Sequence, residues 1–272
     1  MLSLEHLAKL VENHRGDLNA DVREFKIGSQ HFAFNSLPHF MGVVNVSPDS
    51  WYRESVCLTT KNAVERGQLL IKQGAHLVDL GGESTVLDAE RVDAEDQSAR
   101  LVPVIKELAQ TGILVSAETY KSSVARACLE SGAAVIICFV QGDNVRAVDD
   151  RDLPEDPIPL LTDYFEREIQ RATDVGLMKI LIDPGLGFYY QNLRDSQTRV
   201  RHQMEVFLTT FRLRKLGWPI CHALPHAAEI FQEEVRCAEP FFAVLAALGK
   251  TSLFRTHEVP RTKAVLETLS VY

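Results

Sequence analysis

Short apolar runs, each followed by a polar turn and an amphipathic segment, recur along most of this chain. The first run is Phe40–Val44, bounded by Pro38 and by Ser47-Pro48, and its unbroken apolar character is typical of a strand buried on both faces. Similar runs predict strands at 76–80, 113–117, 134–140, 179–183, 219–222 and 252–255. Because strand, polar turn, helix and closing glycine repeat about every 30–40 residues, the pattern indicates successive βαβ units and a parallel sheet.

The segments between these runs carry apolar residues at helical spacing, and most of them end at a glycine. They predict helices at 60–73, 95–110, 122–131, 159–175, 203–216 and 240–248. Before the first strand, Ser3–Asn13 has the pattern of a short amphipathic helix, and Phe25–Phe34 that of a hairpin around Gly28. We therefore expect a single domain, in which an N-terminal helix and hairpin (1–37) pack on the remainder (38–272).

The repeated unit favours a TIM-type (β/α)8 barrel, and 272 residues suit one such barrel. A doubly wound sheet is the alternative, but no G-x-G-x-x-G follows the first strand, so a dinucleotide-binding fold has little support. Only seven clear strand-helix units can be counted, which predicts that one βα unit of the barrel is shortened or missing.

Composition narrows the class of protein further. The net charge of −8 argues against a nucleic-acid partner, whose phosphates require a basic face. No apolar run reaches the roughly 18 residues of a membrane span, so we expect no membrane partner. The five cysteines form no C-x-x-C pair, which fits a reducing, cytoplasmic setting. A small-molecule enzyme or binding protein fits these features.

Polar side chains stand at the ends of the predicted strands, where α/β barrels place their chemistry. They are Asn45, Asp79, Glu83–Thr85, Glu118, Asp183, Arg255 and His257. Each alone has a structural alternative, such as a turn at Asp183 before Pro-Gly, but a barrel brings all of them to one rim. Asp183 and Glu118 are acceptors suited to the N–H edge of an aminated ring.

Four of these residues suit an anion. Arg255 and His257 are suited to gripping a phosphate-like group, because arginine presents a bidentate fork of donors. Thr85 and Asn45 add a hydroxyl and an amide. The rim therefore predicts a site for a ligand that combines an anion with a polar heterocycle.

Taken in order, these motifs resemble the signatures of the dihydropteroate synthase family. The matching segments are Met41–Ser50, Asp79–Thr85, Glu118–Lys121, Asp183–Phe188 and Arg255–His257. The resemblance runs from about residue 38 to 272 and implies a (β/α)8 barrel that binds a pterin pyrophosphate, 7,8-dihydropterin-6-ylmethyl pyrophosphate, with Mg²⁺. In that family the pyrophosphate leaves, the pterin methylene becomes cation-like, and the amine of p-aminobenzoate attacks it.

The resemblance also implies roles for individual residues. Asp183 would hold the pterin ring, with Glu118 and Phe188 as further substrate-binding residues. Asn45 would hold the Mg²⁺-pyrophosphate and is the implied metal contact. Thr85, Arg255 and His257 would hold the anion, so that Asn45, Arg255 and His257 form the implied catalytic set.

The chain departs from the family pattern at four places. Glu118 stands where the family has an aspartate, and Val86–Asp88 where it has Arg-Pro-Gly. The family's Asn-Asp pair after strand four is Cys138-Phe139 in one alignment. In a second alignment Ala134–Val140 is strand five and a βα unit before it is largely deleted. Pro225–Ala227 replaces Ser-Arg-Lys, so the pterin-contacting lysine is lost, and His226 is the nearest replacement donor.

These departures predict a dihydropteroate synthase-like, pterin-binding protein of folate biosynthesis type whose active site is degraded, with weak or no transferase activity. The alternative is an active synthase that condenses dihydropterin pyrophosphate with p-aminobenzoate. A methyltransferase that binds a folate methyl donor is a third reading, which Asn45–Asp49 fits less well than the synthase pattern.

Two further features admit two interpretations each. His222 and His226 are four residues apart, as metal ligands on a helix are, but Pro225 lies between them and no third ligand is evident, so we expect no metal there. The apolar helix at 240–248 suits either a homodimer face or, as we favour, packing in the barrel core.

Overall fold

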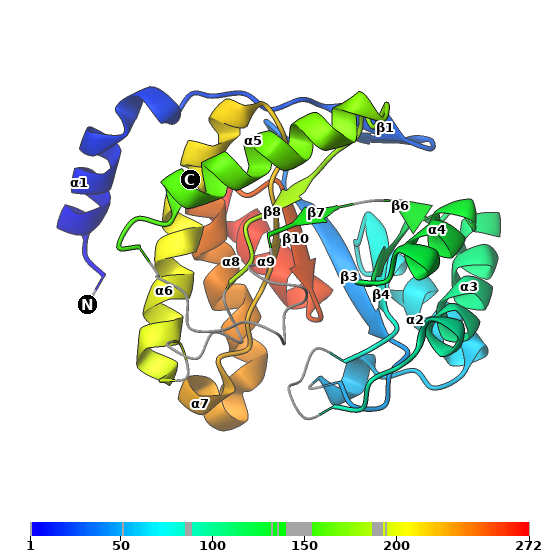
Figure 1. Ribbon diagram of the computed structural model, residues 1–272. Helices are drawn as coiled ribbons and strands as arrows, with labels where there is room; N and C mark the ends of the chain where they lie inside the picture. The colour runs from blue at the N-terminus through cyan, green and yellow to red at the C-terminus, as the bar shows by residue number, and fades with distance from the viewer. Residues whose placement is uncertain are drawn as a thin grey trace.

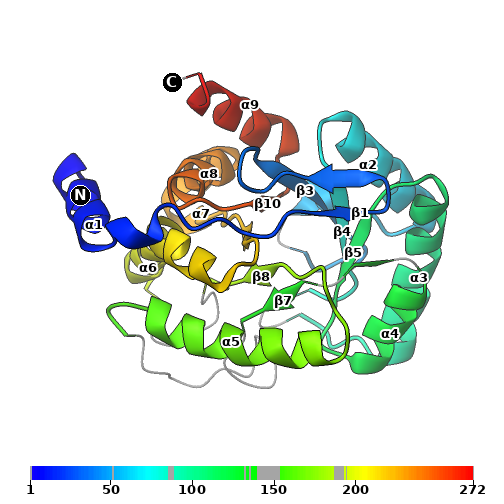
Figure 2. The same ribbon diagram turned by 90° about the horizontal axis from the view of Figure 1, so that it is seen from above.

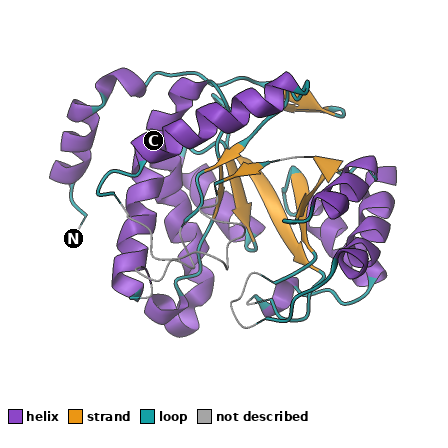
Figure 3. Ribbon diagram, viewed as in Figure 1, coloured by secondary structure: helices purple, strands orange, loops and turns teal. Residues whose placement is uncertain are grey.

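Parallel strands form the centre of the molecule and helices cover its outside (Figures 1 and 3). The computed structural model describes residues 2–50, 52–84, 89–131, 133–134, 136–139, 154–186, 193 and 195–271. The central strands are β3 His39–Asn45, β4 Leu77–Gly81, β5 Val115–Glu118, β6 Ala133–Ala134, β7 Ile137–Cys138, β8 Ile182–Asp183, β9 Cys221–Ala223 and β10 Leu253–Thr256. None of the helices in these ranges is long and apolar enough to cross a membrane.

Within the described residues, the strands close into a ring of seven staves (Figure 2). Six strands pair in the order β6-β5-β4-β3-β10-β9, and β7 pairs with β8. β6 and β7 are two residues apart in the chain and act as one stave, which pairs with β5 at its start and with β8 at its end. A parallel bridge between Ile182 and Ile220 completes the ring from β8 to the segment that enters β9.

The α/β barrel expected from the sequence is therefore present, with one unit fewer than eight in the described chain. The stave made of β6 and β7 pairs with β5, as the fourth strand of a complete barrel would, and with β8, as the fifth strand would. One stave therefore stands where a complete barrel has two strands. For this reason Ala134–Val140 can be aligned with either the fourth or the fifth strand of the family pattern.

One helix follows each stave on the outer surface. These helices are α2 Thr60–Lys72, α3 Ala94–Gln110, α4 Ser122–Glu130, α5 Ile158–Asp174, α6 Ser196–Thr209, α8 Ala238–Leu248 and α9 Val259–Leu269. Apolar faces of α2 and α3 pack on β3 to β5 through residues such as Val44, Leu80 and Leu101. On the other side of the barrel, Phe207 of α6 and Phe242 of α8 share a core with the strands. Burial of this apolar surface is the main force that holds helices on the ring.

The helix expected at 203–216 differs from the one observed. α6 begins seven residues earlier, at Ser196, because the Asp195 side chain caps it by accepting from the amide of Thr198 at 2.8 Å. It also ends earlier, and residues Thr210–Leu216 form a tighter 3₁₀ helix. The Thr210 hydroxyl donates to the Val206 carbonyl at 2.5 Å, and such side-chain bonds compete with regular helix geometry.

Close packing of α8 against α6 leaves no room at Gly249. A Cβ there would lie 1.8 Å from the carbonyl oxygen of Phe207. The core-packing interpretation of this apolar helix holds for one of its faces, since Phe242 and Ala246 are buried. Phe241 and Leu248 on the same helix are exposed.

The N-terminal hairpin, formed by β1 Phe25–Ile27 and β2 Gln30–Phe32, lies at the end of the barrel opposite to the strand exits. The helix before it, α1 Leu4–Asn13, lies at the side, where Leu7 and Leu10 pack against the core that α6 and α8 share. Phe32 and Phe34 pack with Met41 and Leu253, which stand near the starts of β3 and β10. The carboxyl ends of the strands are thus left as the end at which polar residues gather.

Candidate functional site

An arginine on β10 joins two carboxylates from β4 and β5 at the barrel mouth. Arg255 Nε donates to Asp79 Oδ2 at 2.8 Å, and its Nη2 donates to Glu118 Oε2 at 3.2 Å. Asp79 is buried, and its other oxygen accepts from the Ser116 hydroxyl at 2.5 Å. The sequence predicted that these side chains would converge, and they do so across β3, which lies between β4 and β10 in the sheet.

Negative charge exceeds positive charge in this cluster. Asp183 stands at the end of β8 and is buried, and desolvation raises the pKa of its carboxyl to about 6, although the Gly185 amide and Arg255 oppose the shift. Desolvation likewise raises the pKa of Glu118 against the effect of Arg255. Burial lowers the pKa of Arg255, but Asp79 and Glu118 outweigh it and keep the guanidinium charged.

Asp183 is oriented by its own turn. Its Oδ1 accepts from the amide of Gly185 at 2.9 Å, and its Oδ2 lies 4.0 Å from Cys138 Sγ on the neighbouring stave. The turn expected from Asp-Pro-Gly is therefore present, and the charges of Arg255 and Glu118 act in opposite directions on the pKa of this carboxyl.

Asn45 ends β3 with a fixed amide. Its Nδ2 donates to Ser50 Oγ and to Ser55 Oγ, both at 2.7 Å. The Ser55 hydroxyl donates to the Tyr52 carbonyl at 2.7 Å and so must accept from Asn45. These bonds leave Oδ1 as the acceptor of the amide, and it lies over Gly81, where a Cβ would be 2.7 Å from it.

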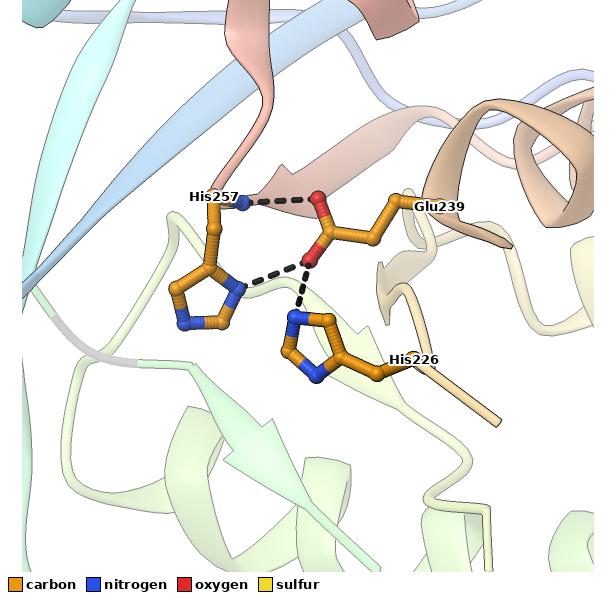
Figure 4. Close-up of side chains that lie close together, drawn as sticks. All are labelled: His226, Glu239 and His257. Carbon is orange, nitrogen blue, oxygen red and sulfur yellow. Dashed lines mark hydrogen bonds and ion pairs between the residues drawn. The ribbon is translucent and has the colours of Figure 1, made fainter. Parts of the chain in front are cut away.

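A second cluster at the mouth contains two histidines around one glutamate (Figure 4). His257 follows β10, Glu239 lies in the first turn of α8, and His226 lies between β9 and α7 Ala228–Phe231. His257 Nδ1 is 2.7 Å and His226 Nε2 is 3.2 Å from Glu239 Oε1. Burial raises the pKa of Glu239, but the imidazoles of His257 and His226 outweigh it and hold the pKa well below its usual range.

An aromatic ring covers this second cluster. The Tyr52 ring lies parallel to His226, with centroids 5.1 Å apart, and 4.9 Å from the His257 ring. The Tyr52 hydroxyl donates to the buried carboxylate of Glu258, which also accepts from Arg236 at 2.5 Å. The loop after β3 is thereby attached to the end of β10.

The sequence located most of the first cluster, and of the second it named His257 and His226 but not Glu239. Thr85 and Phe188, both predicted substrate contacts, lie outside the described residues. Glu239 was missed, although a lone acid in the apolar segment 238–248 is a signal that could have drawn attention to it. Tyr52 and Ser116 carried no distinguishing pattern.

The fold and the mouth together define a parallel α/β barrel with a polar binding site at the carboxyl ends of its strands. A family model described as pterin binding enzyme matches residues 41–155. A dihydropteroate synthase of Streptococcus pyogenes is 29% identical over 272 residues, covering 90% of this chain and 98% of that protein.

Two solved structures are also similar. A Xanthomonas albilineans dihydropteroate synthase with 4-aminobenzoic acid has a TM-score of 0.71 at 27% identity, covering 91% of this chain and 97% of that one. A Yersinia pestis dihydropteroate synthase in a sulfonamide drug complex has a TM-score of 0.77 at 22% identity, over 92% and 98% of the chains, and shows the likeness of fold. In sequence and in fold, the chain is thus similar along most of its length to dihydropteroate synthases, at the identity expected of a divergent relative.

Proposed function

We propose that this protein binds a dihydropterin pyrophosphate at the barrel mouth and condenses it with p-aminobenzoate weakly or not at all. The observation that carries the proposal is the position of Asp183, a buried carboxylate fixed by Gly185 at the exit of β8. A carboxylate that meets adjacent N–H donors of a pterin makes charge-assisted hydrogen bonds of roughly 1.5–3 kcal/mol.

Donors for the pyrophosphate remain beside this carboxylate. Arg255 uses Nε and Nη2 for Asp79 and Glu118, and its Nη1 makes no hydrogen bond with a described residue. His257 uses Nδ1 for Glu239, and its Nε2 likewise has no partner in the described chain. Arg255 Nη1 is a donor for the anion, and His257 Nε2 becomes one when it carries a proton; these are the contacts that the family pattern assigns to this end of the site.

The residues present are suited to the Mg²⁺ that the family implies. Mg²⁺ takes one or two protein oxygens and completes its shell with water and phosphate oxygens. Asn45 Oδ1 is such an oxygen, because both hydrogens of the amide are already donated to Ser50 and Ser55. When bound, the ion would neutralise charge on the departing pyrophosphate.

The chain itself would contribute binding and positioning. Asp183 would hold the pterin, while Arg255 and His257 would hold the leaving group in line and stabilise its charge. Slow turnover is expected because two cationic contacts of the family pattern are absent, with Ala227 in the place of the lysine and Val86 in the place of the loop arginine. Two such losses at roughly 1–3 kcal/mol each slow a reaction by roughly 30-fold to 10⁴-fold.

Calorimetric titration tests this proposal. The full-length protein is titrated with dihydropterin pyrophosphate and Mg²⁺, p-aminobenzoate is then added, and dihydropteroate is measured. We expect saturable binding that Asp183→Ala abolishes, whereas the exposed Asp163→Ala leaves it unchanged. Absence of binding, or unchanged affinity in Asp183→Ala, contradicts the proposal.

An active synthase is the second candidate. It is favoured by the joint presence of Asn45, Asp183, Arg255 and His257 at the ends of β3, β8 and β10. Sustained formation of dihydropteroate in the same experiment, at rates like those of other family members, would establish it in place of the weakly active protein.

A further inference from the structure

The two histidines and the glutamate of the second cluster have the composition of a metal centre. We propose that His226, Glu239 and His257 bind one divalent transition-metal ion, of which Zn²⁺ is the type, through two imidazole nitrogens and one carboxylate oxygen. The proposal goes beyond pterin binding and does not depend on it, because it requires only residues described in the structure.

The spacing of the ligand atoms suits such an ion. One ligand atom from each of the three residues lies within 4.8 Å of the other two. Zn²⁺ binds nitrogen and oxygen ligands at roughly 2.0–2.2 Å, so the ligands of a tetrahedral site stand about 3.3 Å apart. His226 Nε2 is already 3.2 Å from Glu239 Oε1, and His257 Nδ1, at 2.7 Å, needs to move back by about half an ångström.

The carboxylate is held so that one oxygen faces both histidines (Figure 4). Glu239 Oε2 accepts from the amide of His257 at 2.9 Å, from the amide of Glu258 at 3.1 Å and from the Thr256 hydroxyl. Oε1 is left for the imidazoles. Hydrogen bonds to the far oxygen of a ligating carboxylate fix its orientation and support metal affinity.

One ring nitrogen in the cluster has no proper partner. His226 Nε2 is buried and, although near Oε1, does not meet the geometry of a hydrogen bond. An ion would accept its lone pair and that of His257 Nδ1. The proton that His257 Nδ1 shares with Oε1 would move to Nε2, so each neutral ring keeps one proton and the ion gives up bound waters.

Packing preserves the arrangement of the rings. Tyr52 lies against both imidazoles, with an interplanar angle of 12° to His226 and of 35° to His257. Glu239 is fully buried, whereas the side chains of His226 and His257 are 19% and 11% exposed. Water can therefore reach the histidine side of the cluster and occupy a remaining coordination position.

The donor set selects the class of metal. Two imidazoles and one carboxylate suit Zn²⁺, Co²⁺ or Fe²⁺, whereas Mg²⁺ prefers an all-oxygen shell. His222, four residues before His226, is not a ligand, because it is fully buried and its Nε2 contacts Thr210 Oγ1 at 2.8 Å. No third ligand is evident in the segment around His226, because the other two ligands, Glu239 and His257, come from α8 and from the end of β10.

Titration with metal alone tests the site. Tag-free, full-length protein is treated with a chelator, desalted, and titrated with ZnCl₂ by calorimetry and with CoCl₂ by visible absorption. We expect one Zn²⁺ per chain and a Co²⁺ spectrum of tetrahedral intensity. His226→Ala and Glu239→Gln are each expected to weaken Zn²⁺ binding at least 100-fold, whereas the exposed His31→Ala leaves it unchanged.

His226→Ala decides the outcome if the buried Glu239→Gln variant fails to fold, because His226 is partly exposed; circular dichroism verifies its fold. The proposal is overturned by absence of saturable Zn²⁺ binding to folded protein, by unchanged affinity in His226→Ala, or by Mg²⁺ binding as tightly as Zn²⁺ at this site. None of these results bears on pterin binding, which is measured with a different ligand and a different variant.

Discussion

Arg255 donates to Asp79 at 2.8 Å across a strand that contributes neither group. The pair ties β10 to β4 inside the ring and places a guanidinium next to a buried carboxylate. The positive charge that Arg255 offers to an anionic ligand is therefore already partly balanced by Asp79 and Glu118.

Replacing this arginine is expected to destabilise the fold. Arg255→Gln leaves Asp79 buried without its cation, and loss of one partner of a buried pair costs about 3–5 kcal/mol in free energy of unfolding. Urea denaturation measures the change. The double variant Asp79→Asn/Arg255→Gln should recover part of the loss, and a double variant as unstable as the sum of both singles would contradict the pairing.

The stability contribution of Asp183 depends on pH. Its pKa rises from an ordinary 3.8 to about 6 on folding, so the folded state binds this proton more tightly than the unfolded state. The resulting stabilisation is complete below about pH 4 and is lost as the pH rises through about 6.

Asp183→Asn removes this dependence. The difference in unfolding free energy between the variant and the wild type should shift in favour of the variant by roughly 3 kcal/mol between pH 4 and pH 8. Denaturation curves at both pH values measure it, with Asp163→Asn as the control. A difference that stays constant with pH would show that Asp183 has an ordinary pKa.

Gly81→Ala is expected to weaken ligand binding through Asn45. The new Cβ would lie 2.7 Å from Asn45 Oδ1, and the amide cannot retreat without losing Ser50 and Ser55. Mg²⁺-dependent binding of dihydropterin pyrophosphate should fall about tenfold, while the free energy of unfolding falls by about 1–2 kcal/mol. Gly16→Ala, which meets nothing within 4 Å, should leave both unchanged. Full binding in Gly81→Ala would remove Asn45 from the site.

Gly249→Ala tests the packing of α8 against α6 at a place where the obstacle is backbone, not a side chain that could change its rotamer. Its Cβ would meet the backbone oxygen of Phe207 at 1.8 Å, so α6 and α8 must separate. We expect a loss of about 3 kcal/mol or more in unfolding free energy, larger than that of Gly81→Ala, whose obstacle is a side chain. Thermal melts rank the two variants, and the reverse order would show that the helices adjust more easily than the structure implies.

The local pattern of apolar and polar residues predicted the strands and the convergence of polar residues at their ends, because each strand and each helix has its own spacing of apolar positions. They could not indicate what Arg255 would contact. Its partners, Asp79 and Glu118, lie more than a hundred positions away, and an arginine at a strand end looks the same whether it binds an anion or a carboxylate of the chain.

The predicted helix boundaries were wrong where polar side chains determine where a helix begins. The start of α6 depends on Asp195 and a polar first turn, which carries no helical spacing of apolar residues. α9 was not predicted, although Val259–Leu269 follows the last strand, where the helix of that strand's own βα unit belongs. The meeting of His226, Glu239 and His257 was not predicted, because these residues come from separate elements that only the folded barrel brings together.

Among the described strands, the pairings are short beside the carboxylate proposed to hold the ligand. β6 pairs with β5 over two residues and β7 with β8 over two, whereas β3 pairs with β4 over five. Asp183 itself takes part in the β7–β8 pairing, opposite Cys138. A ligand bound to Asp183 would therefore add contacts where backbone hydrogen bonds between neighbouring strands are few, and would stiffen the wall of its own site.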